Sequence, residues 1–408
     1  MTLRISTRGM HEAAIAQIQA RQVSLSKSQT QLASGQRVST PADDPIAATR
    51  ILDIERMQAQ VEQYDKNSTY ATNRLGVTEQ ALSDLGDLLQ RIRQLAVQAN
   101  SGTLDDASLS SIAAELRTRS QELQDIANRR DTSGEYLFAG YSTQGQPFTR
   151  GAAGVGYAGD QGTRSLQVSA TQRITDGLSG DQVFMGVKQG NGRFVTALGA
   201  HAGTGSVDLG EVVNAAAWQA APQPREFTVR FTAPDAWEVL DASGNPLQDG
   251  GAPVSGTYQS GGTIEFLGIR LTVSGAPAVG DTIAVTPAGR ESLFQTVDDL
   301  IGALGAGTAT PESRARFTTA INQALGQLSQ GLDHVTDLRA EVGARLSALD
   351  SATSARSDLQ YELSGSLSEL RDLDYAEAIS RMNQQLVGLQ AAQTAYGRIA
   401  QLSLFSYL

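Results

Sequence analysis

Apolar residues spaced in alternating steps of three and four at both ends of the 408-residue chain constrain its fold more than any other feature. Such spacing places the apolar side chains in one stripe along an α-helix, and the stripe must pack against another helix to leave water. The longest stripe consists of Ile321, Leu325, Leu328, Leu332, Val335, Arg339, Val342, Leu346 and Leu349, and it resumes at Leu363, Leu367 and Leu370. We therefore predict a long helix near the C-terminus.

Further stripes occur on both sides of this one. A final C-terminal stripe consists of Ile379, Met382, Leu386, Leu389, Gln393 and Tyr396, and an N-terminal stripe consists of Ile15, Ile18, Gln22, Leu25, Gln29 and Leu32. Two stripes that predict an antiparallel helix pair consist of Thr78, Leu82, Leu85, Leu89, Ile92 and Ala96, and of Ile112, Leu116, Arg119, Leu123 and Ile126. We predict that the N- and C-terminal stretches share one bundle.

The middle of the chain, residues 144–289, has a different pattern. Glycines are frequent there, and Phe227, Val229 and Phe231 alternate with polar residues, as do Ile269, Leu271 and Val273. The predicted fold is mainly α with an inserted β domain: a long antiparallel helical bundle or coiled coil formed by the terminal segments, plus a β-sandwich-like outer domain. We expect terminal coiled-coil segments at 1–40 with 375–408, a helical core at 41–143 with 290–374, and the glycine-rich β domain at 144–289.

Composition excludes several classes of partner. The net charge of -11 disfavours nucleic acids and anionic membranes, which attract clustered Lys and Arg. The chain has no cysteine, so it forms no disulfide framework. The longest apolar run near the N-terminus, Ala13–Ala16, is far too short for a signal-peptide core or a membrane span, so we expect neither.

No motif predicts catalysis, a metal site or a cofactor. Gly154, Gly156 and Gly159 match G-x-G-x-x-G, but no apolar strand precedes them and a strand-like stretch through Leu166 and Val168 follows instead of a helix, which disfavours dinucleotide binding. The histidines, His11, His201 and His334, lie far from one another and from acidic clusters with metal-ligand spacing. Adjacent Asp43 and Asp44, just before Pro45, are more typical of a helix N-terminus than of a pair of catalytic carboxylates.

Several motifs resemble the flagellin family of bacterial flagellar axial proteins. Leu32-Ala33-Ser34-Gly35-Gln36-Arg37-Val38 followed by Thr40-Pro41-Ala42-Asp43-Asp44-Pro45 is similar to its N-terminal motif, in the proline-flanked form of the family's junction proteins. Similar segments follow in order at Arg91–Asn100, Gly134–Gly140, Val342–Leu346, Asp374–Ala378 and Gln401–Phe405. The resemblance covers about residues 1–145 and 290–408.

The resemblance implies a structural component and not an enzyme. By this resemblance, the protein would join the hook to the filament of the flagellum, outside the cell. It would be exported unfolded through the flagellar type III apparatus without a cleaved signal peptide. The implied partners are copies of itself, a neighbouring hook-associated protein, flagellin subunits, and an export chaperone on about Tyr375–Leu408. A flagellin proper is the alternative, disfavoured by the Asp43-Asp44-Pro45 and Tyr136–Gly140 forms; an enzyme or secreted binding module with its activity in the β insert is a more distant one.

We expect the terminal stripes to be the assembly interface, because an apolar chain end such as Leu402–Leu408 is a typical association site. We also expect both chain ends to become ordered only on assembly, since Gln22 and Gln29 interrupt the N-terminal stripe. The predicted interface residues are Ile5, Ile15, Ile18, Leu25, Leu32, Ile379, Met382, Leu386, Leu389, Tyr396, Ile399, Leu402, Leu404 and Phe405.

Overall fold

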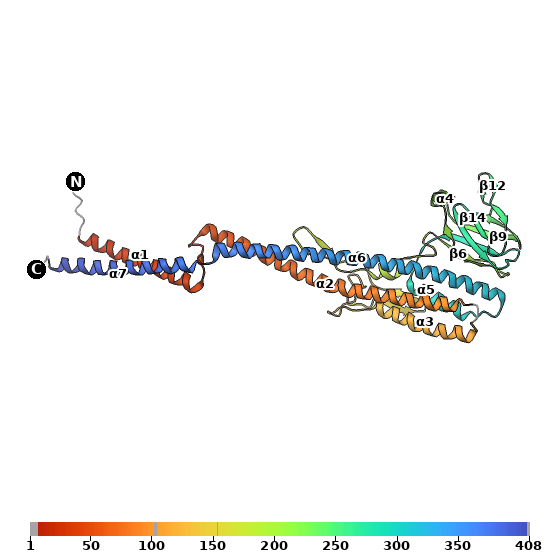
Figure 1. Ribbon diagram of the computed structural model, residues 1–408, viewed down its shortest axis with the longest axis horizontal. Coiled ribbons are helices and arrows are strands. Elements are labelled where there is room, and N and C mark those ends of the chain that lie inside the picture. The colour runs from red at the N-terminus through yellow and green to blue at the C-terminus, as the bar shows by residue number, and fades with distance from the viewer. Residues whose placement is uncertain (1–6, 102–103, 153, 406–408) are drawn as a thin grey trace. The chain divides into compact units, whose positions relative to one another are not determined.

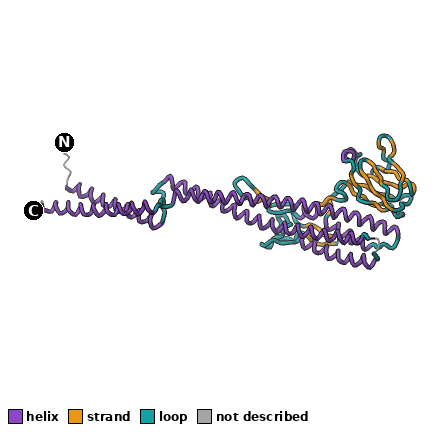
Figure 2. The backbone as a smooth tube through the Cα atoms, viewed as in Figure 1, coloured by secondary structure: helices purple, strands orange, loops and turns teal. Residues whose placement is uncertain are grey.

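The computed structural model describes residues 7–101, 104–152 and 154–405. The helices are α1 (Thr7–Ser34), α2 (Pro45–Ala99), α3 (Asp106–Ala127), α4 (Ala215–Ala220), α5 (Leu293–Gly305), α6 (Pro311–Arg371) and α7 (Tyr375–Phe405), with one π-helical turn at Asp181–Met185. Figure 1 labels these helices, and Figure 2 separates helix from strand by colour. The chain forms two compact units, residues 1–66 with 351–408 and residues 67–350, and both α2 and α6 contribute to each unit.

Seventeen strands lie between α3 and α5 in the described part of the chain. Those on the N-terminal side are β1 (Phe148–Gly151), β2 (Gly154–Tyr157), β3 (Ser165–Gln167), β4 (Arg173–Thr175), β5 (Val187–Lys188), β6 (Phe194–Leu198), β7 (Ser206–Val207) and β8 (Glu211–Val212). The remaining ones are β9 (Phe227–Ala233), β10 (Ala236–Leu240), β11 (Gln248–Asp249), β12 (Ala252–Pro253), β13 (Ser255–Thr257), β14 (Thr263–Phe266), β15 (Ile269–Ser274), β16 (Thr282–Pro287) and β17 (Arg290–Glu291).

In the first unit, α1 pairs with α7, and the start of α2 packs on the end of α6. The α2–α6 contact buries Val38, Ala47, Ile51 and Leu367. Gln58 Nε2 donates to Ser364 Oγ across this pair, and Asp65 lies opposite Arg356, so the two helices are antiparallel. The predicted pairing of N- and C-terminal helices is confirmed in this unit.

In the second unit, the predicted helix stripes form the core. The stripe of α2 from Thr78 to Ala96 is fully buried, and so are Ile112, Leu116, Leu123 and Ile126 of α3. Arg91 binds Glu115, and Arg129 binds Asp84, which makes α2 and α3 antiparallel as predicted.

Two arginines that we placed in stripes lie outside them. Leu338 fills the layer assigned to Arg339, whose guanidinium instead binds Glu79 at 2.6 Å. Ser120 likewise is buried in place of Arg119, which binds Glu122 at 2.7 Å. Arg339 and Arg119 reach their carboxylates from the edge of the helix interface, so the neighbouring Leu338 and Ser120 take the interior positions.

The β domain is a two-sheet sandwich with one core. A five-stranded sheet has the order β13-β10-β9-β16-β6, and a four-stranded sheet has the order β14-β15-β7, with β8 also paired to β15. The alternating residues predicted from the sequence, Phe227, Val229 and Phe231 of β9 and Ile269, Leu271 and Val273 of β15, all belong to the shared core. A mainly α fold with an inserted β domain is therefore confirmed.

The short strands β1 to β5 pack with the helices. The Phe184 ring lies 5.1 Å from that of Phe148 and 5.8 Å from that of Phe294 of α5, between ring centroids. Asn128, which follows α3, donates through Nδ2 to the Phe148 carbonyl and accepts from the Phe148 N–H, so its amide acts as one more residue of a β-ladder. The boundaries at 143 and 290 drawn from the sequence remain a prediction.

One face of α6 holds the β domain by hydrogen bonds. Thr319 Oγ1 accepts from Val207 N, Gln323 Nε2 donates to the Thr196 carbonyl, and Gln327 Oε1 accepts from Gly190 N. These three donors and acceptors are spaced by four residues and so share a face of the helix. Gly326 lies beside them, and a Cβ atom there would lie 2.0 Å from Leu209 Cδ1, so the bare backbone makes room for that side chain.

A buried ion pair fixes the turn after α3. Arg74 of α2 and Asp131 have side chains that are 5% and 6% exposed, and their closest atoms are 2.5 Å apart. Arg74 also donates to the Tyr136 carbonyl. Burial opposes ionisation of Asp131, but hydrogen bonds from Ser133 and the Glu135 N–H, together with the charge of Arg74, keep its pKa below the ordinary value.

None of the helices in the described ranges is long and apolar enough to cross a membrane.

Replacing Gly326 with Ala tests the seat of the β domain on α6. The new methyl group would displace the whole Leu209 side chain, so we expect a loss of about 1–2 kcal/mol in the free energy of unfolding. Gly343→Ala on the same helix is the matched control, because a Cβ there meets nothing within 4 Å. Helix propensity alone should make that variant about 0.5–1 kcal/mol more stable. Urea unfolding followed by circular dichroism measures both, and equal effects would contradict the assignment.

Replacing Arg74 with Ala tests the buried ion pair. The substitution leaves the Asp131 carboxylate buried without its countercharge, which costs about 3–5 kcal/mol. Arg91→Ala removes a more exposed ion pair with Glu115 in the same unit and should cost about 1 kcal/mol or less. The same unfolding measurement ranks the two variants, and similar losses would argue against a structural role for Arg74.

Candidate assembly interface

Two chain segments cross at the joint between α1 and α2 on one side and α6 and α7 on the other. Gly35 ends α1 with φ 71°, in the left-handed region that glycine adopts without strain. A Cβ at Gly35 would also lie 2.8 Å from the Tyr375 hydroxyl oxygen. Leu373 N donates to the Gly35 carbonyl at 2.9 Å, and Arg37 N donates to the Arg371 carbonyl at 2.7 Å. The crossing segments thus form a minimal antiparallel ladder.

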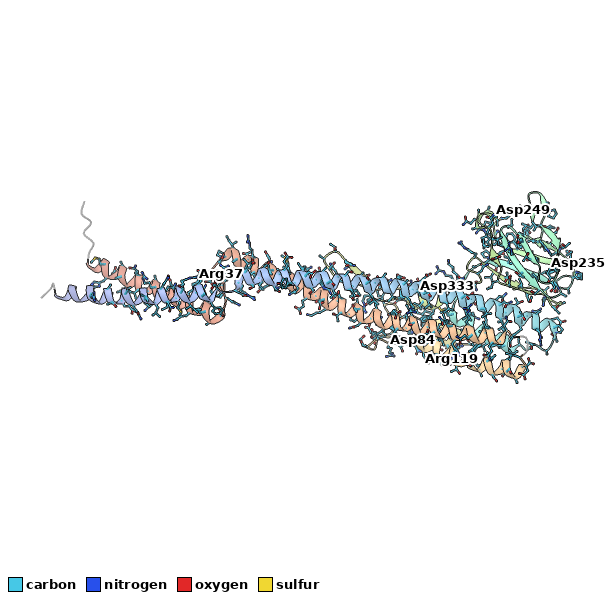
Figure 3. All side chains as sticks on the ribbon, viewed as in Figure 1. Arg37, Asp84, Arg119, Asp235, Asp249 and Asp333 are labelled. Carbon is cyan, nitrogen blue, oxygen red and sulfur yellow. The ribbon has the colours of Figure 1, made fainter. Side chains whose placement is uncertain are left out.

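Arg37 ties three parts of this joint together. Its Nη2 donates to the Leu370 carbonyl at 2.7 Å, and its Nη1 lies 3.4 Å from Asp44 Oδ2. Its own carbonyl accepts from Gln31 Nε2 of α1 at 2.7 Å. Figure 3 labels Arg37 where the terminal helix pair begins. The Leu32–Val38 motif therefore holds the end of α1 against the end of α6 by hydrogen bonds.

Asp44 caps the start of α2, as predicted from the sequence, whereas Asp43 binds α1 and the turn before α2 instead of the helix N-terminus. Asp44 Oδ1 accepts from Ala47 N at 3.0 Å, as an N-cap does, and Pro45 is the first helical residue. Asp43 binds Lys27 of α1 at 2.6 Å and accepts from Thr40 N at 2.9 Å. The Lys27 ammonium, followed by the Thr40 N–H, holds the pKa of Asp43 far below its usual value. The Ala47 N–H, followed by Arg37, lowers the pKa of Asp44.

The seam between α1 and α7 is partly polar. Ser28 Oγ donates to Gln385 Oε1 at 2.8 Å, and both Ser28 and Gln31 are buried. Near the other end of the pair, the rings of His11 and Tyr396 meet edge to face at 5.6 Å. Six predicted interface residues are half-buried on this pair, namely Ile18, Leu25, Leu32, Met382, Leu389 and Tyr396.

Other apolar residues on the same two helices point to solvent. The exposed fraction is 47% for Ile379 and 38% for Leu386 on α7, and 42% for Ile15 on α1, all of them predicted interface residues. Val23 and Val387 are still more exposed, at 70% and 63%, and the sequence analysis missed them because neither follows the stripe spacing. We call Ile15, Val23, Ile379, Leu386 and Val387 the exposed apolar set.

The other predicted interface residues are not placed. Ile5 lies outside the described residues, and so do the side chains of Ile399, Leu402, Leu404 and Phe405. The role of the apolar segment Leu402–Leu408 in assembly therefore stays a prediction.

The motifs that we set aside as chemical sites have structural settings. Gly154 and Gly156 belong to strand β2 of a hairpin with β1, which is not a nucleotide-binding turn. His334 Nε2 lies 2.8 Å from the Gln182 carbonyl oxygen, and His201 lies 3.5 Å from Asp281. The described residues contain no group of three His, Cys, Asp or Glu side chains that could hold a metal ion.

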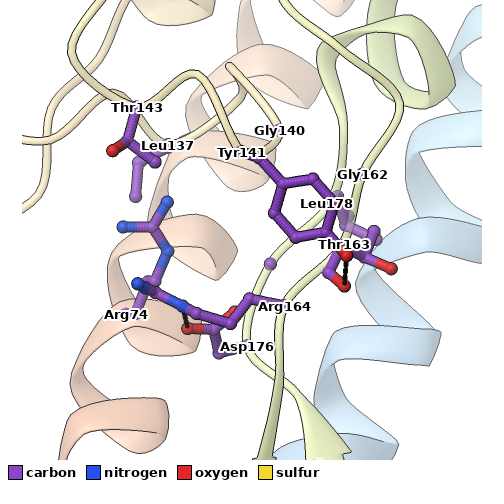
Figure 4. A pocket seen from close by; sticks show the side chains of 11 residues that line it. Arg74, Leu137, Gly140, Tyr141, Thr143, Gly162, Thr163, Arg164, Asp176 and Leu178 are labelled. Carbon is purple, nitrogen blue, oxygen red and sulfur yellow. Dashed lines mark hydrogen bonds and ion pairs between the residues drawn. The ribbon is translucent and has the colours of Figure 1, made fainter.

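A cavity of about 80 Å³ lies beside two arginines of the second unit (Figure 4). Arg164 Nε binds Asp176 at 2.8 Å, and Arg74 binds Asp131, so carboxylates neutralise both guanidinium groups. The Tyr141 hydroxyl closes one side by donating to the Thr163 carbonyl. The turns around Gly140 and Gly162 are held by Asp160, whose Oδ1 accepts from the N–H groups of Tyr141 and Gly162.

Comparison with known proteins identifies the family. Models of the bacterial flagellin N-terminal and C-terminal helical regions match residues 5–143 and 325–408. Flagellar hook-associated protein 3 of Escherichia coli is 26% identical over 404 residues, 99% of each chain. Its counterpart from Salmonella typhimurium is 35% identical over 45% of this chain and 57% of its own length.

A solved structure supports the same assignment. The crystal structure of Xanthomonas campestris FlgL has a TM-score of 0.71 and 32% identity, and the match covers 77% of this chain and 99% of that one. The chain therefore belongs to the flagellin family, within the group that contains FlgL, the flagellar hook-associated protein 3.

Proposed function

We propose that this protein is a structural component of the bacterial flagellum that joins the hook to the filament and associates through its terminal helices. The observation that carries the proposal is the exposed apolar set on α1 and α7. Exposed apolar side chains of this size mark association sites, because burying each one contributes about 1.5–3 kcal/mol. Family membership supports the flagellar setting.

The partners follow from this position in the axis. We propose contacts with copies of itself, with a neighbouring hook-associated protein and with flagellin subunits. A cytoplasmic export chaperone would bind about Tyr375–Leu408 before unfolded export through the flagellar type III apparatus without a cleaved signal peptide, and the protein would function outside the cell. No enzymatic activity belongs to this proposal.

A flagellin is the second candidate. The alignment with hook-associated protein 3 over nearly the whole of both chains favours the junction role. The two roles differ in behaviour, since purified flagellin would grow long filaments by itself and a junction protein would not.

Substitutions on the outward face of α7 test the proposal. In a strain that lacks this gene, we expect cells to make hooks and to release flagellin into the medium. The double variant Ile379→Asp, Leu386→Asp should fail to restore motility, with incorporation reduced by about 100-fold or more, because assembly would bury two charges at several kcal/mol each.

The matched control places the same charges on a polar part of the same helix. Ser380 and Gln384 are exposed and lie on a different side of the helix from Ile379 and Leu386, so Ser380→Asp, Gln384→Asp should restore normal motility. Normal flagella in the Ile379, Leu386 variant would contradict the proposed interface. Wild-type levels of both variants in the cell exclude degradation as the cause.

Amide hydrogen exchange tests whether the terminal helices order only on assembly. In the isolated protein we expect amides of α1 residues 10–34 to exchange at least about 100-fold faster than those of α2 residues 75–96. The physical reason is the seam, since α1 buries Ser28 and Gln31 where α2 buries Leu82 and Leu89. Equal protection in the two regions would contradict this prediction.

A further inference from the structure

His201 lies in the loop between β6 and β7, where the β domain meets the start of α6. Its side chain is 1% exposed, and Nδ1 lies 3.5 Å from Asp281 Oδ2. Its Nε2 atom is buried without a hydrogen-bond partner among the described residues. These surroundings favour the neutral form of the imidazole, because a proton on Nε2 would create a buried N–H group with no acceptor.

Asp281 accepts hydrogen bonds from the backbone of two loops. Its carboxylate accepts from Ala202 N at 2.7 Å and Gly203 N at 3.1 Å in the His201 loop, and from Ala278 N at 2.9 Å in the loop before β16. A Cβ at Gly203 would lie 2.4 Å from Ala278 N, so the loops touch at this point. Movement of His201 would therefore disturb both loops.

Helix α6 closes the third side. Arg316 Nη2 donates to the His201 carbonyl at 3.2 Å, which ties the loop to α6. The charged groups that face the imidazole are Asp281 from the β-domain loop and Arg316 and Glu312 from α6. Burial is the largest influence and lowers the pKa of His201; Asp281 and Glu312 oppose it, Arg316 adds to it, and the net direction is downward.

We propose that His201 is a proton-sensitive latch, which holds the loop of residues 199–205 against the start of α6 when neutral and releases it when protonated. The inference rests on the enclosed ring, the unpartnered Nε2 and the shared Asp281, and it does not depend on the assembly interface.

The sign of the pH dependence follows from the direction of the shift. The open loop takes up a proton near the ordinary His pKa of 6.5, and the closed loop takes one up only at lower pH. Above pH 6.5 the imidazole is neutral in both states, so closing the loop carries no free-energy cost of deprotonation. It becomes less favourable as pH falls, by about tenfold in the closing equilibrium for each pH unit between the two pKa values.

Hydrogen exchange of the full-length protein between about pH 7.5 and about pH 5 tests the latch. After correction for intrinsic exchange, we expect protection of the Ala202 and Gly203 amides to fall by about tenfold for each pH unit between 6.5 and the lower pKa of His201 in the closed loop. The variant His201→Gln should lose this dependence, because an amide side chain does not titrate. His334→Gln, which removes a histidine of the same unit from a position on α6, should retain it.

Two results would overturn the proposal. One is protection at Ala202 and Gly203 that is independent of pH in the wild-type protein, and the other is an unchanged dependence in His201→Gln. If the loop of the His201→Gln variant is open at every pH, NMR titration of the His201 imidazole in the wild-type protein tests the proposal instead. An inflection below 6.5 supports the latch, and one at or above 6.5 refutes it.

Discussion

The packing of the N-terminal helices against the C-terminal helices is the interaction on which the rest of the fold depends. Bringing chain ends this far apart into contact costs about 5 kcal/mol of loop-closure entropy. A few buried leucines such as Leu82, Leu85 and Leu89 offset that cost at about 1.5–3 kcal/mol each. The β domain can be inserted without disrupting the bundle because both of its ends return to helices that are already packed.

Much of this arrangement could be predicted, because helix periodicity is a local property. The stripes through Leu82 and Leu116 became buried helix faces, and the alternation at Phe227 became a core strand. The choice between adjacent positions could not be predicted in the same way. Whether Leu338 or Arg339 faces inward depends on a carboxylate at Glu79, 260 residues away, which no local pattern reveals.

The candidate interface shows the same division. Ile379 and Leu386 stood out through their spacing, but Val23 and Val387 became visible only once the α1–α7 pairing was known. His201 and Asp281 are separated by 80 positions, and sheet topology alone brings them together. Spacing predicts which residues share a helix face, and only tertiary structure tells which faces remain uncovered.

The polar seam of α1 and α7 has a kinetic consequence. Hydroxyl and amide groups such as those of Ser28 and Gln385 bond almost as well to water as to each other, so separating the helices at these positions forfeits little free energy. A pair held in this way can come apart and re-form quickly. In the assembly that we propose, each terminal helix would change partners between subunits while α2 and α6 stay packed.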